Sequence, residues 1–391
     1  MAIAHKTTGL NRSWTMDTNV SDLPQRLLVV SRSARMLARS AARAGLSPVA
    51  LDLYGDADTR ESALVCEAVA ASEAGFDPDA LLAAAARLAP AASHPLVYGS
   101  GLDVAPDLLE RLAEDREVLG NAAATVRLLK APREFFALLR ELGIAHPETR
   151  FSPPDDASGW LVKAGCGEGG RGVRFAAQDS AGAGDYFQRW LPGESCSALF
   201  LADGANSRVL GFNTLWSVVR FGRPFMFAGA LNRAKLTERE REQVRGYVAR
   251  MTRTVGLRGL NSLDFVADGE VCRVLEINPR PSATMGLYDA DFPAGLLAAH
   301  VRACRGRLDA PRPNEDSVRA CAIVFAPRSF VAPESVSWPE WCADRPAPGV
   351  VVEKGGPLCT VEAEGRKAIE VEALTVRRRA EVLDLLFPCG P

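Results

Sequence analysis

The sequence predicts a mixed α/β protein in which an amino-terminal domain with a parallel sheet precedes a region of strands and a small β-rich end. In the first third, apolar runs such as Leu27–Val30 alternate with helical patterns, as in strand–helix–strand units. From Trp160 onward, short apolar runs separated by glycine turns predominate. With 391 residues, the chain is long enough for two or three domains with large cores.

Residues 23–118 are predicted to form the parallel-sheet domain, after a mobile polar tail at residues 1–22. The strands are expected at Leu27–Val30, Pro48–Tyr54 and Pro95–Gly101. The helices are expected at Ala34–Ala44, Arg60–Ala74, Asp79–Leu88 and Pro106–Arg116. Gly45 is the expected end of the first helix, because glycine readily adopts the left-handed conformation found there.

Residues 119–312 are predicted to form the central domain. Its helices are expected at Ala122–Leu129, Arg133–Leu142, Thr237–Val255 and Ala294–Arg305. Its strands are expected at residues 160–164, 172–176, 185–191, 197–201, 208–216 and 225–230, followed by a hairpin over 262–279. Asp268–Gly269 supplies the turn of that hairpin.

A link rich in proline and arginine, Asp309–Asp316, marks the boundary to a β-rich domain over residues 313–391. Its strands are expected at residues 319–326, 349–353, 358–364 and 368–374, closed by a helix over Val376–Leu386.

Composition and charge exclude several classes of protein. The net charge of −2 argues against a general binder of nucleic acid or of anionic membranes. No apolar run is long enough for a membrane span or a signal peptide. The nine cysteines are scattered and form no CxxC pair, so we expect free thiols in a cytoplasmic protein, with Cys166 an incidental small residue. Only six of the 46 basic residues are lysines, which makes their positions worth following.

The first candidate site is the glycine-rich segment Leu161–Phe175, in which a predicted strand presents Lys163 before a loop. Backbone N–H groups of such a loop can converge on phosphate oxygens, and a lysine adds a positive charge. The segment is neither a P-loop nor a dinucleotide fingerprint, because no GK[ST] and no helix follow. A flexible hairpin is the alternative, and Glu168 is expected on the surface. The candidate phosphate-binding glycines are Gly167, Gly169, Gly170 and Gly172.

The second candidate site is the hairpin over residues 262–279. Asp264 lies on one strand, and Glu276 and Asn278 share a face of the other. Oxygen ligands of this kind suit Mg²⁺ that also contacts a substrate phosphate. Arg280 follows two residues later and can reach a phosphate or an acyl phosphate. The alternative is that the acids are solvated positions of a half-buried hairpin.

Taken in order, these motifs resemble the ATP-grasp superfamily over nearly the whole chain. Lys130, in VRLLKAPREFF, and Lys163 resemble the two phosphate-binding lysines of that family. Gln188–Glu194 (QRWLPGE) resembles the hinge between its two subdomains, with Gln188 in place of the commoner Glu. The resemblance implies that the backbone near Trp190 and Leu191 contacts adenine and that Glu194, or Ser195, faces the ribose. Asp264, Glu276 and Asn278 match the family's magnesium ligands.

The resemblance implies an ATP-dependent carboxylate–amine ligase that forms an amide through an acyl phosphate and releases ADP and phosphate. Lys163 and Arg280 would be the catalytic cations, and ATP with Mg²⁺, or with Mn²⁺, the cofactors. The chain looks closest to predicted carboligases related to biotin carboxylase, which implies addition of an amino acid such as glutamate to a one-carbon cofactor precursor. The partners would be a small carboxylate, a small amine and a second copy of the chain, with no nucleic acid and no membrane. A bicarbonate-activating carboligase and a non-catalytic nucleotide-binding protein remain open alternatives.

Overall fold

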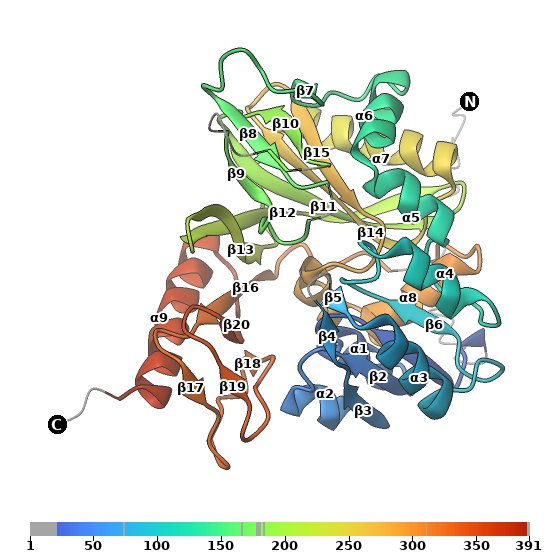
Figure 1. The fold of residues 1–391 in the computed structure, drawn as a ribbon, viewed down its shortest axis with the longest axis vertical. Coiled ribbons are helices and arrows are strands. Elements are labelled where there is room, and N and C mark those ends of the chain that lie inside the picture. The colour runs from blue at the N-terminus through green and yellow to red at the C-terminus, as the bar shows by residue number, and fades with distance from the viewer. Residues whose placement is uncertain are drawn as a thin grey trace, which may run out of the picture.

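The computed structural model describes residues 22–72, 75–165, 167–176, 181–182, 184–309 and 311–388. The predicted amino-terminal tail, apart from Asp22, and Cys166 lie outside the described residues. The architecture combines parallel and antiparallel sheets with flanking helices, as predicted from the sequence (Figure 1).

The amino-terminal sheet is fully parallel, with the strand order β3-β2-β1-β6. Its strands are β1 (Arg26–Val30), β2 (Ser47–Asp52), β3 (Val65–Ala68) and β6 (Leu96–Tyr98). Its helices are α1 (Arg35–Arg43), α2 (Ala57–Ser62), α3 (Pro78–Leu88) and α4 (Pro106–Ala113). A small hairpin joins β4 (Ala71–Ser72) to β5 (Gly75–Phe76). Strand β1 is buried from Leu27 onward, which explains its continuous apolar run.

The predicted helix at Arg60–Ala74 is wrong. The helix α2 ends at Ser62, and the chain then forms the edge strand β3, which pairs with β2 in parallel from Val49 and Val65. The next residue along, Val69, donates its backbone N–H to the oxygen of Asp52 at 2.7 Å. Pairing with the open edge of β2 therefore outweighs the local helical preference of this alanine-rich stretch.

The central region contains a four-stranded sheet and most of an eight-stranded antiparallel sheet. The smaller sheet has the order β7-β10-β8-β9, with β7 (Thr149–Arg150), β8 (Trp160–Lys163), β9 (Val173–Phe175) and β10 (Tyr186–Arg189). The larger sheet begins with β15 (Cys272–Asn278), β14 (Arg258–Ala267), β11 (Glu194–Asp203), β12 (Ser207–Arg220) and β13 (Arg223–Leu231). The helices α5 (Ala123–Lys130), α6 (Pro132–Glu141) and α7 (Glu238–Val255) accompany these sheets (Figure 1). Two 3-10 turns, Ala283–Leu287 and Asp289–Asp291, lead into α8 (Gly295–Cys304).

The strands of the carboxy-terminal region continue the larger sheet. Strand β16 (Val318–Phe325) pairs with β13, and β20 (Pro357–Gly365) and β18 (Cys342–Ala343) follow. A separate pair consists of β17 (Phe330–Val331) and β19 (Val351–Val352). One continuous sheet thus connects the hairpin that carries Glu276 to the last strands of the chain.

The predicted strand over residues 368–374 is also wrong, because these residues are the first turns of α9 (Ala368–Leu386). Val371 is buried on the sheet, whereas Ile369 is 73% exposed. The Thr375 hydroxyl donates to the Val371 oxygen one turn earlier, at 2.7 Å. Packing of one helical face on β16 and β20 decides the conformation, since the apolar positions fit a helix once the sheet is complete.

The predicted helix over Thr237–Val255 is confirmed, and its two ends lie where they were expected. Thr237 and Glu240 form a reciprocal capping box, and Gly256 closes the helix with a φ of 68°. None of the helices among the described residues is long and apolar enough to cross a membrane.

Candidate active site

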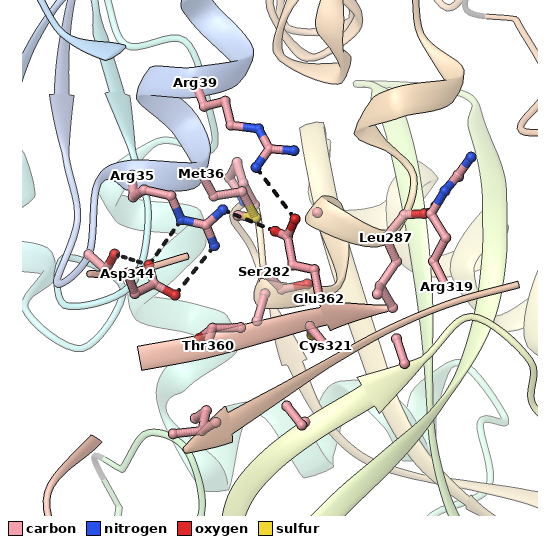
Figure 2. Close-up of a pocket in the computed structure, with 18 of the residues that line it drawn as sticks. Arg35, Met36, Arg39, Ser282, Leu287, Arg319, Cys321, Asp344, Thr360 and Glu362 are labelled. Carbon is pink, nitrogen blue, oxygen red and sulfur yellow. Dashed lines mark hydrogen bonds and ion pairs between the residues drawn. The ribbon is translucent and has the colours of Figure 1, made fainter. Parts of the chain in front are cut away.

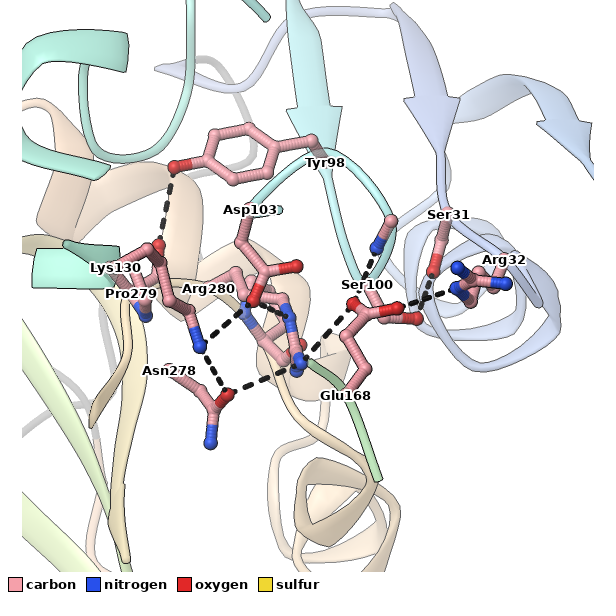
Figure 3. A network of polar contacts seen from close by, with 12 residues as sticks. Ser31, Arg32, Tyr98, Ser100, Asp103, Lys130, Glu168, Asn278, Pro279 and Arg280 are labelled. Carbon is pink, nitrogen blue, oxygen red and sulfur yellow. Dashed lines mark hydrogen bonds and ion pairs between the residues drawn. The ribbon is translucent and has the colours of Figure 1, made fainter. Parts of the chain in front are cut away.

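Lys130 and Arg280 meet at one polar cluster where the amino-terminal sheet faces the central sheet (Figure 3). Lys130 ends α5, and its Nζ donates to the Asn278 Oδ1 at 3.1 Å. Arg280 follows β15 and donates its Nη2 to the same oxygen at 3.3 Å. Two cations predicted from distant motifs therefore share one amide oxygen.

Lys163 lies at the end of β8 and is held by Gln188 on the neighbouring strand. Its Nζ donates to the Gln188 Oε1 at 2.8 Å, and the Gln188 Nε2 donates to the Thr149 hydroxyl at 3.2 Å. Burial lowers the pKa of Lys163, against the charges of Glu276 and Asp264, which raise it. Gln188, only 1% exposed, thus has an acceptor role for its side chain, toward Lys163.

Asp264 and Glu276 face each other across the β14–β15 ladder. Burial, followed by the negative charge of Glu276, raises the pKa of Asp264 well above its usual value. The Asn278 Nδ2 donates to the Asp264 Oδ2 at 3.2 Å, which places all three predicted metal ligands together. Two enclosed carboxylates beside each other repel, and a cation between them would remove this repulsion.

Asp103, which we did not single out in the sequence, completes this cluster from the loop after β6. Its carboxylate is fully buried and lies 3.0 Å from the Arg280 Nε and 3.4 Å from the Lys130 Nζ (Figure 3). Burial alone would raise the pKa of Asp103, but the charges of Arg280 and Lys130 lower it to about 2. Its position at the carboxyl end of a parallel strand was the available signal, because ligand sites of α/β sheets gather there.

Glu168 was expected on the surface, but it is half-buried, with its side chain 12% exposed. The Arg32 Nε donates to one of its carboxylate oxygens at 2.5 Å, and the Gly101 N–H donates to the other at 2.7 Å. Its Oε1 also lies 3.9 Å from the Arg280 Nη2. Burial, followed by the charge of Asp103, raises the pKa of Glu168. Glu168 therefore ties the glycine-rich loop to the amino-terminal domain, beside Arg280.

The glycine-rich loop lies against β13. The Phe227 N–H donates to the Gly169 oxygen at 3.0 Å. A Cβ on Gly170 would lie 1.8 Å from the Phe225 oxygen, so only glycine permits this approach. A Cβ on Gly172 would meet the Ala164 Cβ at 2.6 Å, whereas Gly167 has nothing closer than 3.9 Å. Gly170 and Gly172 are needed for packing, and Gly167 is on the open side of the loop.

A comparison with known families assigns this region. Residues 133–284, which include every part of the cluster except Asp103 and Lys130, match a family model described as an ATP-grasp domain. Residues 133–284 are an ATP-grasp domain. The sequence matches no curated protein.

Solved structures extend the likeness of this ATP-grasp chain beyond the matched domain. The biotin carboxylase domain dimer of the Hydrogenobacter thermophilus 2-oxoglutarate carboxylase, in complex with MgADP, ADP and bicarbonate, is 14% identical. The similarity covers 91% of this chain and 89% of that one, with a TM-score of 0.69. N5-carboxyaminoimidazole ribonucleotide synthetase from Thermus thermophilus is 17% identical over 93% and 99% of the two chains, with a TM-score of 0.65.

A third similar structure is the phosphoribosylamine–glycine ligase from Thermotoga maritima. It is 15% identical over 91% of this chain and 96% of that one, with a TM-score of 0.65. At these identities the likeness establishes the fold, which this chain shares with the ligases and carboxylases along nearly its whole length. The predicted ATP-grasp fold is thereby confirmed.

The predicted hinge, Gln188–Glu194, runs from the end of β10 to the start of β11. The Trp190 N–H donates to the Gly159 oxygen at 2.9 Å, and the indole is 44% exposed. Glu194 begins β11 and accepts a hydrogen bond from the Thr214 hydroxyl at 2.7 Å. The contacts of Trp190, Leu191 and Glu194 with a nucleotide remain predictions.

Two cavities adjoin the cluster. A narrow one of about 50 Å³ is lined by Lys130, Gly165, Gly167, Tyr186 and Glu276. A larger one of about 560 Å³ lies between α1, the segment after β15 and the strands β16 and β20 (Figure 2). Arg280 lines the larger cavity and belongs to the polar cluster, so this side chain connects that cavity to the cluster.

Proposed function

We propose that the chain is an ATP-dependent carboxylate–amine ligase that forms an amide through an acyl phosphate and releases ADP and phosphate. The observation that carries the proposal is the meeting of Lys130, Arg280 and the Asp264–Glu276 pair beside a cavity large enough for a small molecule. Phosphoryl transfer depends mainly on positioning and charge neutralisation, which such a set of groups supplies.

The residues present fit a bound magnesium ion. Asp264 and Glu276 offer carboxylate oxygens. Burial, followed by the charge of Glu276, raises the pKa of Asp264, and a divalent cation would favour the ionised form again. The amide nitrogen of Asn278 faces Asp264, so the amide group must rotate to present its oxygen to a metal ion. Mg²⁺, for which Mn²⁺ would substitute, supplies charge neutralisation of the phosphates when bound with ATP.

The protein's own groups have distinct tasks in this reaction. Lys130 and Lys163 hold the phosphates of the nucleotide, together with N–H groups of the loop around Gly167. Arg280 stabilises the negative charge of the phosphoryl group in transfer and then the acyl phosphate. The loop, tied down through Glu168, excludes water from an intermediate that hydrolyses readily.

The narrower expectations rest on sequence resemblance. They are that the enzyme adds an amino acid such as glutamate to a one-carbon cofactor precursor, and that it works in the cytoplasm. A homodimer is supported by the dimer named for the similar biotin carboxylase domain.

A second candidate function is a bicarbonate-activating carboligase. The likeness to a biotin carboxylase domain that holds MgADP and bicarbonate favours it. In this reaction bicarbonate takes the place of the organic carboxylate, and Arg280 has the same task.

Release of ADP from ATP distinguishes the candidates. A ligase releases ADP only when a carboxylate and an amine are both present, whereas a bicarbonate-activating enzyme needs bicarbonate alone. Thermal stabilisation by MgATP, without turnover for any combination of carboxylate, amine and bicarbonate, would support a non-catalytic nucleotide-binding protein instead.

The matched pair of variants is Glu276→Gln and Glu270→Gln, which lie on the same hairpin. Glu276 lies at the cluster, and Glu270 is exposed at the turn. The proposal expects turnover to be lost only in Glu276→Gln. Equal activity of the two variants would refute the metal assignment.

A further inference from the structure

The 560 Å³ cavity lies where an α/β sheet places its ligands. In the order β3-β2-β1-β6, the chain connects β1 outward to β2 on one side, and β6 lies on the other side of β1. Ligands bind outside the carboxyl ends of the strands at such a reversal. Ser31 and Ser33 after β1, and Gly99 and Ser100 after β6, line the cavity as this rule requires. The volume is within the range of about 300–1,000 Å³ typical of small-molecule sites.

The lining has an excess of positive charge. Five arginines contribute to it, namely Arg35, Arg39, Arg280, Arg319 and Arg378. Three carboxylates oppose them, namely Asp344, Glu362 and Glu364. Apolar side chains, including Met36, Leu287 and Trp341, complete the wall. The cavity thus suits a molecule with an anionic group and an apolar body.

Two of these arginines are already fully engaged. Arg35, which is 9% exposed, donates to both oxygens of Asp344, at 3.0 and 3.3 Å, and to Glu362 at 3.2 Å. Arg319, which is 12% exposed, donates to Asp291 at 2.8 Å and to Glu364 at 3.1 Å. These contacts are costly to break, because the largely buried guanidinium groups would be left without a counter-charge.

Arg39 differs from both. Its side chain is 47% exposed. Among the residues that the structure describes, it contacts the carboxylate of Glu362 alone, at 3.5 Å, the length at which hydrogen bonds become weak (Figure 2). Glu362 keeps Arg35 as a partner if Arg39 leaves. A substrate carboxylate can therefore take the Arg39 guanidinium in a two-pronged hydrogen bond without stranding a buried charge.

We propose that this cavity binds the acidic substrate, a small carboxylate with an apolar body, and that Arg39 is its anchor. The inference deepens the proposed function and rests on it, because Arg280 connects the cavity to the polar cluster where the phosphates of ATP are proposed to bind. A carboxylate held from α1 presents its remaining atoms toward the segment after β15, where the reaction is expected.

The test is thermal stabilisation by a panel of small carboxylates, each compared with its own uncharged primary amide. At least one carboxylate should stabilise the wild-type protein more than its amide. Arg39→Ala should weaken that binding by about 10- to 100-fold, the loss typical of a charged hydrogen bond. Arg43→Ala is the matched control, because Arg43 lies one turn along α1 and pairs with Asp289 at 2.8 Å, outside the cavity lining. Each shift is measured relative to the melting temperature of the same variant.

Two outcomes would overturn the inference. The first is that no carboxylate stabilises the wild-type protein more than its amide does. The second is that Arg39→Ala binds the carboxylate as tightly as the wild type does. MgADP in the same assay separates this inference from the proposed function. Stabilisation by MgADP without any carboxylate effect refutes only the cavity assignment, whereas absence of the MgADP effect refutes nucleotide binding itself.

Discussion

The polar cluster around Lys130 and Arg280 and the large cavity both contain several cationic side chains, but the positive charge is balanced by different partners in the two sites. In the cluster, Lys163 donates to the amide of Gln188, and Lys130 and Arg280 share the amide of Asn278. In the cavity, Arg35 and Arg319 are paired with carboxylates at hydrogen-bond distance. Apart from Asp103 and Glu168, the partners that a phosphate would displace in the cluster are neutral amides, whereas a ligand of the cavity competes with several carboxylates. The difference suits one site to a highly charged nucleotide and the other to a small acid.

Asp103 is the exception within the cluster, as the one carboxylate that contacts both Lys130 and Arg280 among the residues that the structure describes. Its charge holds the two cations in position together with the amide of Asn278. Arg39 is the exception within the cavity. These two residues therefore offer the sharpest ways to test the comparison.

The largest effect is expected from Lys163→Met. Removing a cation from a water-poor phosphate site should lower the rate of ADP release by about 10³-fold, as for the loss of one strong charge-stabilising donor. Single-turnover formation of ADP, measured after quenching, isolates the chemical step from product release. Lys235→Met is the control, because Lys235 is exposed before α7, and its activity should stay at the wild-type level. A comparable loss in both variants would contradict the special role of Lys163.

A smaller loss is expected from Asp103→Asn. The variant keeps the shape of the side chain but removes the charge that orients Lys130 and Arg280. We expect kcat to fall by about 10- to 100-fold through their misplacement, with a lesser change in KM for ATP. Asp103→Glu should recover part of the rate, because it restores the charge.

Asp289→Asn is the matched control for Asp103, since Asp289 is also buried and pairs with an arginine, Arg43. It should lose stability while the folded protein keeps its kcat. If Asp103→Asn behaved in the same way, Asp103 would have only a structural role.

The acidic residues around Asp344, which lines the cavity, predict a pH effect on stability. Asp56 lies near Asp344, Asp52 and Asp58, and burial, followed by their charges, raises its pKa to about 8. A carboxyl group whose pKa is raised on folding favours the folded state only while protonated. The free energy of unfolding should therefore fall as the pH rises from about 4 to about 8.

Asp56→Asn removes this titration. The variant should be more stable than the wild type by about 1–3 kcal/mol near pH 8, with little difference near pH 4. Denaturant unfolding at the two pH values measures it, with the exposed Asp79→Asn as control. Identical pH dependence of wild type and Asp56→Asn would refute the assignment.

The smallest effect is expected from Thr237→Ala, which lies outside both sites. Loss of the capping box of α7 should cost about 1 kcal/mol of stability. The kcat and both KM values should stay unchanged. A change in activity would show that α7 communicates with the site.

The residues of the cluster could be predicted to different extents. Lys130, Lys163, Asp264, Glu276, Asn278 and Arg280 lie in local motifs, and the structure brings all of them except Lys163 into one chain of hydrogen bonds or paired strands. Lys163 joins them through its electrostatic interaction with Glu276 and Asp264. Asp103 and Glu168 could not be assigned, because their roles depend on how the amino-terminal domain meets the glycine-rich loop.

The fold shows the same division. Strands and helices with strong local signals, such as β1 and α7, are where the sequence predicts them. The segments over residues 60–74 and 368–374 were predicted wrongly, because pairing with β2 and packing on β16 and β20 decide their conformation. The cavity was beyond prediction for the same reason, since its walls come from α1, β16 and β20 together.

The central claim is that ATP activates a carboxylate as an acyl phosphate, and hydroxylamine trapping tests it most directly. The protein is incubated with MgATP, the carboxylate identified by thermal stabilisation, and hydroxylamine in place of the amine. The account predicts a hydroxamate of that carboxylate in equal amount to the ADP released, and neither product in Glu276→Gln. Release of ADP without hydroxamate, or formation of AMP in place of ADP, would contradict it.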